Sequence, residues 1–244
     1  ENTQPYTLQL GSGQMLADLT QIPVVYDFRS DFIMAGFDGA PLVPPHNAHI
    51  SASEGDGCYY NGGNTSNFAL IRGGKALLSS DSGPFNEYID AYIRKHTDMS
   101  FDEGGKLGRQ GKVDIRLAEK LFELGADFYE QSLPKSGDPA YYRKQEVLNM
   151  VETSTLPKAD IVRTLEYFAA YVAVEALTLV PADIPLSERF VLFGGGWKNP
   201  VVRAAFEDLI SGKGEILALH EERFKKFYQR LGHKIGRASC RERV

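Results

Sequence analysis

The most regular part of the sequence is a set of three apolar runs separated by glycine pairs. Residues 58–80, CYYNGGNTSNFALIRGGKALLSS, contain β-branched and aromatic residues and are interrupted at Gly62-Gly63 and at Gly73-Gly74. Strand-forming runs bounded by glycine pairs are typical of β-hairpins. The pattern predicts a strand, a glycine turn, a second strand, a tight hairpin and a third strand.

Several longer segments place their apolar residues three or four positions apart, as on one face of a helix. Residues 156–180 are apolar on most faces, which predicts a largely buried helix. The other predicted helices are the segment after Asp81 with Tyr88, Ile89, Tyr92 and Ile93 on one face, residues 112–124 with Asp114 as N-cap, the segment between Asn199 and Gly212 with Pro200 in its first turn, and residues 221–231.

Three further segments carry weaker signals. Residues 22–28, IPVVYDF, are β-branched and aromatic and predict a buried strand. The glycines and prolines of residues 29–47 exclude regular structure there, so we expect an ordered loop. Residues 189–193 and 215–219 each predict a strand. Strands that alternate with helices through glycine turns predict an α/β protein.

Composition and charge narrow the class of protein. The chain has 244 residues, 43% of them hydrophobic, and a formal charge of -5, with no block of Lys and Arg among aromatics. Neither a membrane-length apolar run nor a signal-peptide core is present, and two cysteines cannot form a disulfide framework. We expect a soluble cytoplasmic protein without nucleic-acid or membrane partners.

Both ends of the sequence are unusual. The chain begins at Glu1 rather than Met, and residues 235–244, IGRASCRERV, are rich in arginine without helical or strand period. That tail resembles translated sequencing-adapter DNA, the alternative being an ordinary basic tail. We therefore expect an incomplete chain and exclude residues 235–244 from the fold prediction.

Glycine turns at the ends of predicted strands are the first candidates for chemistry. They lie at Gly62-Gly63, at Gly83 and at Gly194-Gly195-Gly196. Such turns let backbone N–H groups approach a phosphate, and ligands of α/β sheets gather at the carboxyl ends of strands. Three of them favour a nucleotide or another polyanion, although the sequence contains neither a Walker A motif nor a dinucleotide fingerprint.

Asp81, in SSDSGPFNEYIDAY (79–92), is the second candidate. On its own, an acid before a predicted helix is usually a turn or capping residue. His46 and His49 have a spacing that reaches a metal, but no Cys or further His lies nearby, so we interpret them as loop or core residues. No nucleophile elbow accompanies the serines around Asp81.

The order of the motifs resembles that of the 1,6-anhydro-N-acetylmuramic acid kinases. The motifs are TLQLGSGQMLADLTQIPVVYDFRS, AGFDGAPLVPP, a Gly-Gly strand turn, SSDSGPFNEYIDAY, GKLGRQGKVD, LPKS and VLFGGGWKNP, running from Thr7 to Gly212. The chain departs from the family pattern in lacking its opening phosphate-binding hairpin and its C-terminal portion. It also has Asp38 where the family has Gln and Phe85 where a small residue is usual.

The resemblance implies an α/β fold of the actin-like ATPase (ribonuclease H-like) class. Residues 1–50 would be a remnant of the first lobe with the substrate loop, and residues 51–234 most of the second lobe. The family uses ATP and Mg²⁺ to open the anhydro ring of the cell-wall amino sugar and to phosphorylate its O6, in peptidoglycan recycling. We expect the chain as written to be inactive, and a homodimer is compatible with the resemblance.

The resemblance also implies roles for individual residues. Asp81 would be the catalytic base, and no residue is expected to be a dedicated metal ligand. The expected ATP contacts are Gly62, Gly63, Gly194, Gly195, Gly196 and Asn199, and the expected amino-sugar contacts are Asp38, Gly39, Ala40, Pro41 and Asn86. Two alternatives stay open: a nucleotide-binding module of the same fold without catalysis, and another sugar or acetate kinase of that superfamily.

Overall fold

The structure, a computed structural model, describes residues 8, 10–34, 42, 44–137 and 142–232. Its strands are β1 (Gly57–Gly62), β2 (Thr65–Arg72), β3 (Lys75–Pro84) and β4 (Phe190–Phe193). Its helices are α1 (Gly13–Thr20), α2 (Phe28–Met34), α3 (Pro44–Glu54), α4 (Asn86–His96), α5 (Ile115–Leu124), α6 (Ala126–Tyr129), α7 (Lys144–Glu152), α8 (Lys158–Thr178), α9 (Pro200–Ile210) and α10 (Glu221–Arg230). Within these ranges, none of the helices is long and apolar enough to cross a lipid bilayer.

The four strands form one sheet in the order β3-β2-β1-β4. β2 runs antiparallel to both β1 and β3, and β4 runs parallel to β1. The tight hairpin between β2 and β3 turns at Gly73 and Gly74, whose φ values of 57° and 70° suit glycine. The three strands predicted from residues 58–80 are therefore confirmed, as are β4 and the mixed α/β class.

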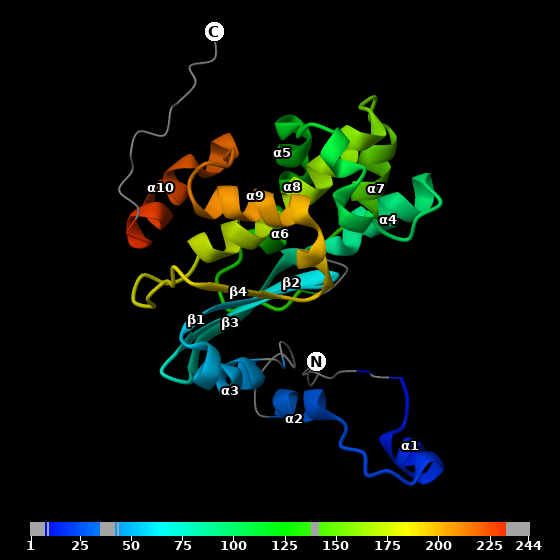
Figure 1. Ribbon diagram of the computed structural model, residues 1–244, viewed down its shortest axis with the longest axis vertical. Coiled ribbons are helices and arrows are strands. Elements are labelled where there is room, and N and C mark those ends of the chain that lie inside the picture. Colours follow the sequence, from blue (N-terminus) through cyan, green and yellow to red (C-terminus); the bar gives the residue numbers. More distant parts are fainter. Residues whose placement is uncertain (1–7, 9, 35–41, 43, 138–141, 233–244) are drawn as a thin grey trace, which may run out of the picture.

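Helices α4 to α10 cover one face of the sheet (Figure 1). At their centre lies α8, which is buried along most of its length and contacts α4, α5, α9, α10 and β3. Predicted caps are confirmed at two helices: the Asp114 side chain accepts a hydrogen bond from Leu117 N, and that of Asn199 from Val201 N. This face holds the large hydrophobic core.

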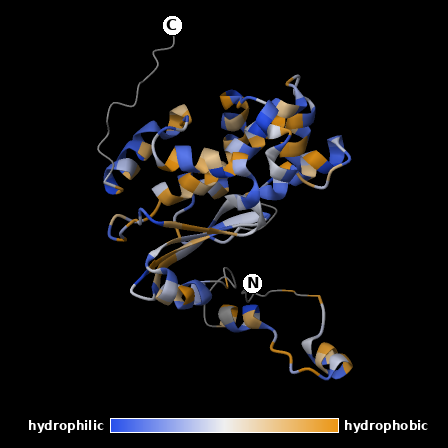
Figure 2. Ribbon diagram, in the orientation of Figure 1, coloured by the Kyte–Doolittle hydropathy of each residue, from blue (hydrophilic) through white to orange (hydrophobic). Residues whose placement is uncertain are grey.

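The opposite face of the sheet carries much less structure. Tyr59, Ala69 and Ile71 form a small cluster there, against which α3 packs Ala48 and Ile50. Farther from the sheet, α1 has no buried residue, and Leu10, Leu19 and Val25 are 94%, 77% and 77% exposed. Figure 2 shows apolar residues along this N-terminal part. The predicted lobe boundary after residue 50 falls inside α3, and the division into lobes stays a prediction.

Three segments differ from their predictions. Residues 22–28 form no strand, because within the described structure they have no neighbouring strand and Val25 is exposed. Residues 29–47 are not all loop: α2 occupies their start and α3 begins at Pro44, where a helix tolerates the missing N–H. Residues 215–219 end in a 3₁₀ turn (Ala218–His220) rather than forming a strand. Residues 235–244 lie outside the described residues.

Candidate functional site

A row of polar side chains crosses the face of the sheet opposite the helical core. Asn61 on β1 pairs with Asn67 on β2, which pairs with Asp81 on β3. Side chains alternate between the two faces along a strand, so Asn61 lies on the same face as Tyr59, and Asn67 on that of Ala69. Asp81 is therefore on the α3 side of the sheet, away from α8.

A β-bulge on β3 lies directly after Asp81. Asn67 pairs with Asp81 and Ser66 pairs with Gly83, so Ser82 is the extra residue. The Ser82 hydroxyl donates to Ser66 O over 3.0 Å, which ties the bulge to β2. Bulges change the direction of a neighbouring side chain and are frequent beside active sites. The bulge at Ser82 thus helps to set the direction of the Asp81 side chain.

Asp81 does not cap the helix that follows it. It belongs to β3, and α4 begins at Asn86 with Phe85 in the N-cap position and no side-chain capping bond. The capping role that its position before a helix allowed is therefore not what the structure shows. Asp81 is instead a strand residue with 6% exposure.

Backbone groups hold Asp81 on both sides. Gly137 N donates to Oδ2 of Asp81 over 2.8 Å, and the Asp81 amide donates to Lys135 O over 3.0 Å. Burial raises the pKa of the Asp81 carboxyl, while the Gly137 hydrogen bond and the charges of Arg29 and Lys135 lower it. A fixed, buried carboxylate with nearby cations is suited to accept a proton.

Arg29 is a site residue to which the sequence analysis gave no role. It lies on α2, and its positive charge acts on Asp81 from an element far away in the sequence. Asp27, two residues earlier, has a φ of 67°, which is uncommon outside glycine and turns the chain into α2. The Asp-Phe-Arg motif was the signal that could have identified Arg29.

Two of the predicted glycine turns lie side by side. Parallel pairing of β1 and β4 brings Gly62 next to Gly194. A Cβ added to Gly194 would lie 2.6 Å from Gly62 O. Gly62 is packed against Phe85 and Trp197, with which a Cβ would collide. Within the described part of the chain, nothing lies within 4 Å of a Cβ built on Gly195. The backbone at Gly195 is therefore open to a ligand, whereas Gly62 and Gly194 are glycines for packing reasons.

Asn86 joins these glycine turns rather than the polar row. Its amide donates to Gly63 O over 3.1 Å, and a Cβ on Gly196 would lie 2.9 Å from its side-chain Nδ2. Asn86 is also the first residue of α4, where backbone N–H groups favour an anion. The structure thus gathers Gly63, Gly196 and Asn86 at one end of β1 and β4.

The side chain of Asn199 is used within the protein. Its Oδ1 caps α9, and its Nδ2 donates to Glu166 Oε1 over 2.6 Å. Glu166 is fully buried on α8, and burial raises its pKa to about 8. A contact of Asn199 with ATP stays a prediction, and the observed function of this amide is to pair with Glu166.

The predicted sugar loop, Asp38, Gly39, Ala40 and Pro41, lies outside the described residues. A cavity of about 460 Å³ lies between α2 and α3, lined by Phe28, Asp31, Leu42 and Pro45. Among the described residues, no group of three or more His, Cys, Asp and Glu could hold a metal ion. His46 and His49 are exposed on α3.

Comparisons with known proteins agree with the motif order. The family model described as Anhydro-N-acetylmuramic acid kinase matches residues 1–220. Curated relatives with that name include one from Agrobacterium fabrum, 32% identical over 88% of this chain and 56% of the relative, and one from Xanthomonas campestris, 33% identical over 85% and 54%. A third, from Neisseria meningitidis, is 32% identical over 88% of this chain and 57% of its own length. The chain spans about half the length of the curated relatives it matches.

Two solved structures that the chain matches are distant from it in sequence. One is component A of the (R)-2-hydroxyglutaryl-CoA dehydratase of Acidaminococcus fermentans, with a TM-score of 0.44 and 14% identity over 75% of this chain and 63% of that chain. The other is the activator of the 2-hydroxyisocaproyl-CoA dehydratase from Clostridium difficile, with a TM-score of 0.45 and 12% identity over 77% and 65%. Likeness at this level carries no argument about the site.

Proposed function

Because this chain belongs to the anhydro-N-acetylmuramic acid kinase family, we propose that the protein opens the 1,6-anhydro ring of anhydro-N-acetylmuramic acid and phosphorylates its O6 at the expense of ATP. The product would be N-acetylmuramic acid 6-phosphate. The observation that carries the proposal is Asp81, a buried residue whose carboxylate accepts a hydrogen bond from Gly137 N and whose amide donates to Lys135 O, on the α3 side of the sheet.

The proposed chemistry needs a base at the anomeric carbon. A water molecule attacks C1 while a carboxylate takes its proton, and the bond between C1 and O6 breaks. O6 then receives the phosphoryl group. Asp81 is suited to the first step because Arg29 and Lys135 favour its ionised form against the burial that opposes it. The remaining step is mainly positioning and charge neutralisation.

The glycine turns are the proposed ATP contacts. The open backbone at Gly195 would receive the adenosine side, and Gly62 and Gly63 with the start of α4 would lie toward the phosphates. The fit rests on the space at the Cβ position of Gly195, which no described residue outside its chain neighbours approaches within 4 Å. When bound, ATP with Mg²⁺ supplies the phosphoryl group. Mg²⁺ is commonly held through phosphates with one or two carboxylates, so a protein metal cluster is not required.

The amino sugar is proposed to bind between the polar row and the N-terminal part. The predicted loop at residues 38–41 follows α2 directly, and α2 supplies Arg29, whose charge acts on Asp81. Asn86 would contact the sugar from the glycine turns. In this proposal the reacting sugar would lie between Asp81 on one side and the ATP contacts on the other.

The proposal is tested in the full-length protein, meaning a chain of the relatives' length that contains this sequence. ATP and the anhydro sugar are supplied in water labelled with ¹⁸O, and ADP and sugar 6-phosphate are measured. We expect one ADP for each sugar 6-phosphate and the label at the anomeric oxygen. N-acetylmuramic acid, N-acetylglucosamine and acetate serve as competing acceptors. Preferred phosphorylation of one of these would favour another kinase of the superfamily, and absence of turnover a non-catalytic module.

A further inference from the structure

The outer edge of β3 is covered by the segment that contains Lys135 and Gly137. The Lys135 amide donates to the Ser80 hydroxyl oxygen over 2.9 Å, and its carbonyl accepts the Asp81 N–H over 3.0 Å. Two residues later, Gly137 N donates to the Asp81 carboxylate. Any movement of this segment would change both the backbone and the side chain of Asp81.

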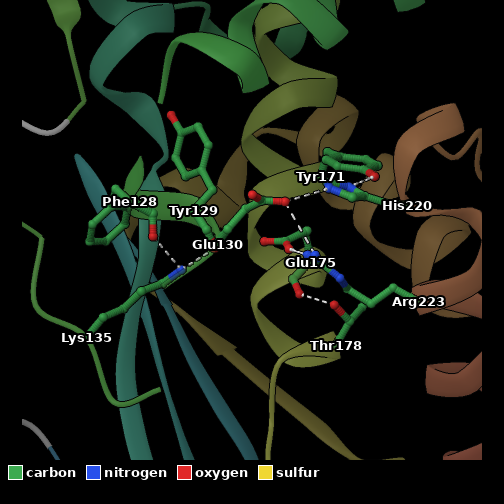
Figure 3. A network of polar contacts seen from close by, with 9 residues as sticks. All are labelled: Phe128, Tyr129, Glu130, Lys135, Tyr171, Glu175, Thr178, His220 and Arg223. Carbon is green, nitrogen blue, oxygen red and sulfur yellow. Dashed lines mark hydrogen bonds and ion pairs between the residues drawn. The ribbon is translucent and has the colours of Figure 1, made fainter. Parts of the chain in front are cut away.

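The side chain of Lys135 anchors the segment to α6. Its ammonium donates to Phe128 O over 3.0 Å and to Tyr129 O over 2.6 Å, at the last turn of that helix. It also lies 4.7 Å from the centre of the Phe128 ring, and the residue is 4% exposed. Figure 3 shows the side chain directed from its loop toward these carbonyls. A cation at a helix C-terminus is favourable.

The charges around Lys135 connect it to a buried network. Burial lowers its pKa to about 8, Glu175, Asp81 and Glu130 raise it, and Arg223 lowers it. Glu175 and Arg223 form an ion pair between α8 and α10, and Arg223 also lies 3.4 Å from Glu130. With a pKa of about 8 the ammonium is mostly charged at neutral pH. Lys135 is therefore a buried cation that faces both this network and Asp81.

We propose that Lys135 is a positioning residue for the catalytic carboxylate: by binding the end of α6 it fixes the segment whose backbone holds Asp81. The charge of Lys135 also lowers the pKa of Asp81. The inference rests on the proposed function for the role of Asp81. Lys135 itself touches no reacting atom in this scheme. A purely structural lysine would stabilise the fold without affecting the proton affinity of Asp81.

The test compares Lys135→Met and Lys135→Gln with Lys95→Met in the full-length protein. Met keeps an unbranched stem without donors or charge, and Gln keeps an N–H donor without charge. Lys95 is a matched control, because its side chain is 55% exposed and pairs with Glu152 on the helical side. Thermal unfolding shows first whether each variant is folded.

We expect Lys135→Met to lower kcat by about 10- to 100-fold at an unchanged KM for ATP. The acid limb of kcat against pH should move to higher pH, because Asp81 loses one nearby cation. Among the described residues, the other charged or titratable groups that interact electrostatically with Asp81 are Arg29, Tyr60 and Tyr142, and they are the same in all variants. Lys135→Gln should recover part of kcat with the acid limb still displaced, and Lys95→Met should change neither.

A second readout does not depend on turnover. The amides of Asp81 and Gly137 should exchange hydrogen about tenfold faster in Lys135→Met than in the parent. If the parent has no kinase activity, the proposed function is refuted. Faster amide exchange in Lys135→Met than in that parent would still support the positioning of Asp81 by Lys135. Parent-like kcat, acid limb and exchange in folded Lys135→Met would overturn the inference. So would failure of both Lys135 variants to fold, which would assign Lys135 to folding alone.

Discussion

The two faces of the sheet differ in what they contribute. On one face, Tyr60 and Phe68 point into a large core around α8, and side chains such as Phe168 are fully buried. On the other face, a small cluster around Tyr59 lies beside the polar row that ends at Asp81. The comparison teaches that one face supplies most of the folding free energy, while the other keeps polar groups available for chemistry.

Removing a core side chain on the helical face should have the largest effect. Phe168 packs against Tyr88 and Tyr129, with ring centres 6.4 Å and 5.8 Å away. We expect Phe168→Ala to lower the free energy of unfolding by about 3–5 kcal/mol. Phe193→Ala, on the half-buried opposite face, should lower it by roughly 1–2 kcal/mol. Chemical denaturation of both variants measures the two losses of unfolding free energy. Equal losses would contradict the larger contribution of the helical face.

The buried carboxyl of Glu166 should make stability depend on pH. Its pKa of about 8 in the folded protein lies above its ordinary value of 4.5. Between these two values the folded protein binds a proton that the unfolded chain has released, so stability falls as pH rises from about 4.5 to about 8. The slope would be at most about 1.4 kcal/mol per pH unit.

Glu166→Gln should remove this decline, because a neutral amide needs no proton, while Asn199 can still donate to its carbonyl oxygen. Unfolding free energies at pH 5 and pH 8 measure the effect. The control is Glu207→Gln, an exposed acid on α9, which should leave the slope unchanged. If the parent and Glu166→Gln share the same slope, Glu166 is not the group responsible.

Loss of the cation on α2 should affect the polar face without destabilising the core. Arg29 lowers the pKa of Asp81, so Arg29→Met should raise it, and the acid limb of kcat should move to higher pH. Arg29→Lys keeps the charge and should retain most of the parent's profile. The pH dependence of turnover in the three proteins is the measurement. An unmoved acid limb in Arg29→Met would show that Arg29 does not influence the pKa of Asp81.

The smallest expected effect is at the open glycine. Gly195 has no neighbour within 4 Å of a Cβ position, so Gly195→Val should leave unfolding nearly unchanged and block backbone approach by ATP. We expect ATP to bind about tenfold or more weakly in calorimetry. Gly73→Val, in the remote hairpin, is a control for ATP binding alone, because the φ of 57° at Gly73 strains any added side chain. Parent-like affinity in Gly195→Val would remove Gly195 from the ATP contacts.

The sequence predicted the elements whose signals are local. The Gly73-Gly74 hairpin, the Asp114 cap and the apolar surface of α8 each depend on neighbouring residues in the chain, and each is confirmed. The predicted strand at residues 22–28 failed because a strand needs a partner that the sequence does not name. Prolines near Pro44 suggested a loop, although the first turn of a helix accepts them.

The site was predicted only in part for the same reason. Asp81 was identified from its motif, but its place inside β3 depends on a bulge opposite Asn67. Arg29 and Lys135 act on Asp81 from positions about fifty residues away along the chain on either side. Such contacts leave no period or spacing in the sequence, so only the folded arrangement identifies them.

The central claim is that Asp81 acts in catalysis rather than in folding. Asp81→Asn in the full-length protein keeps the size of the side chain and an oxygen that can accept the Gly137 N–H, but it removes the base. ADP release and sugar 6-phosphate formation are followed together in parent and variant, with unfolding and ATP binding as controls. The account predicts unchanged stability and ATP affinity, and a fall in both product rates by on the order of 10²–10⁴-fold. A folded Asp81→Asn protein that forms both products at near-parent rates would contradict it.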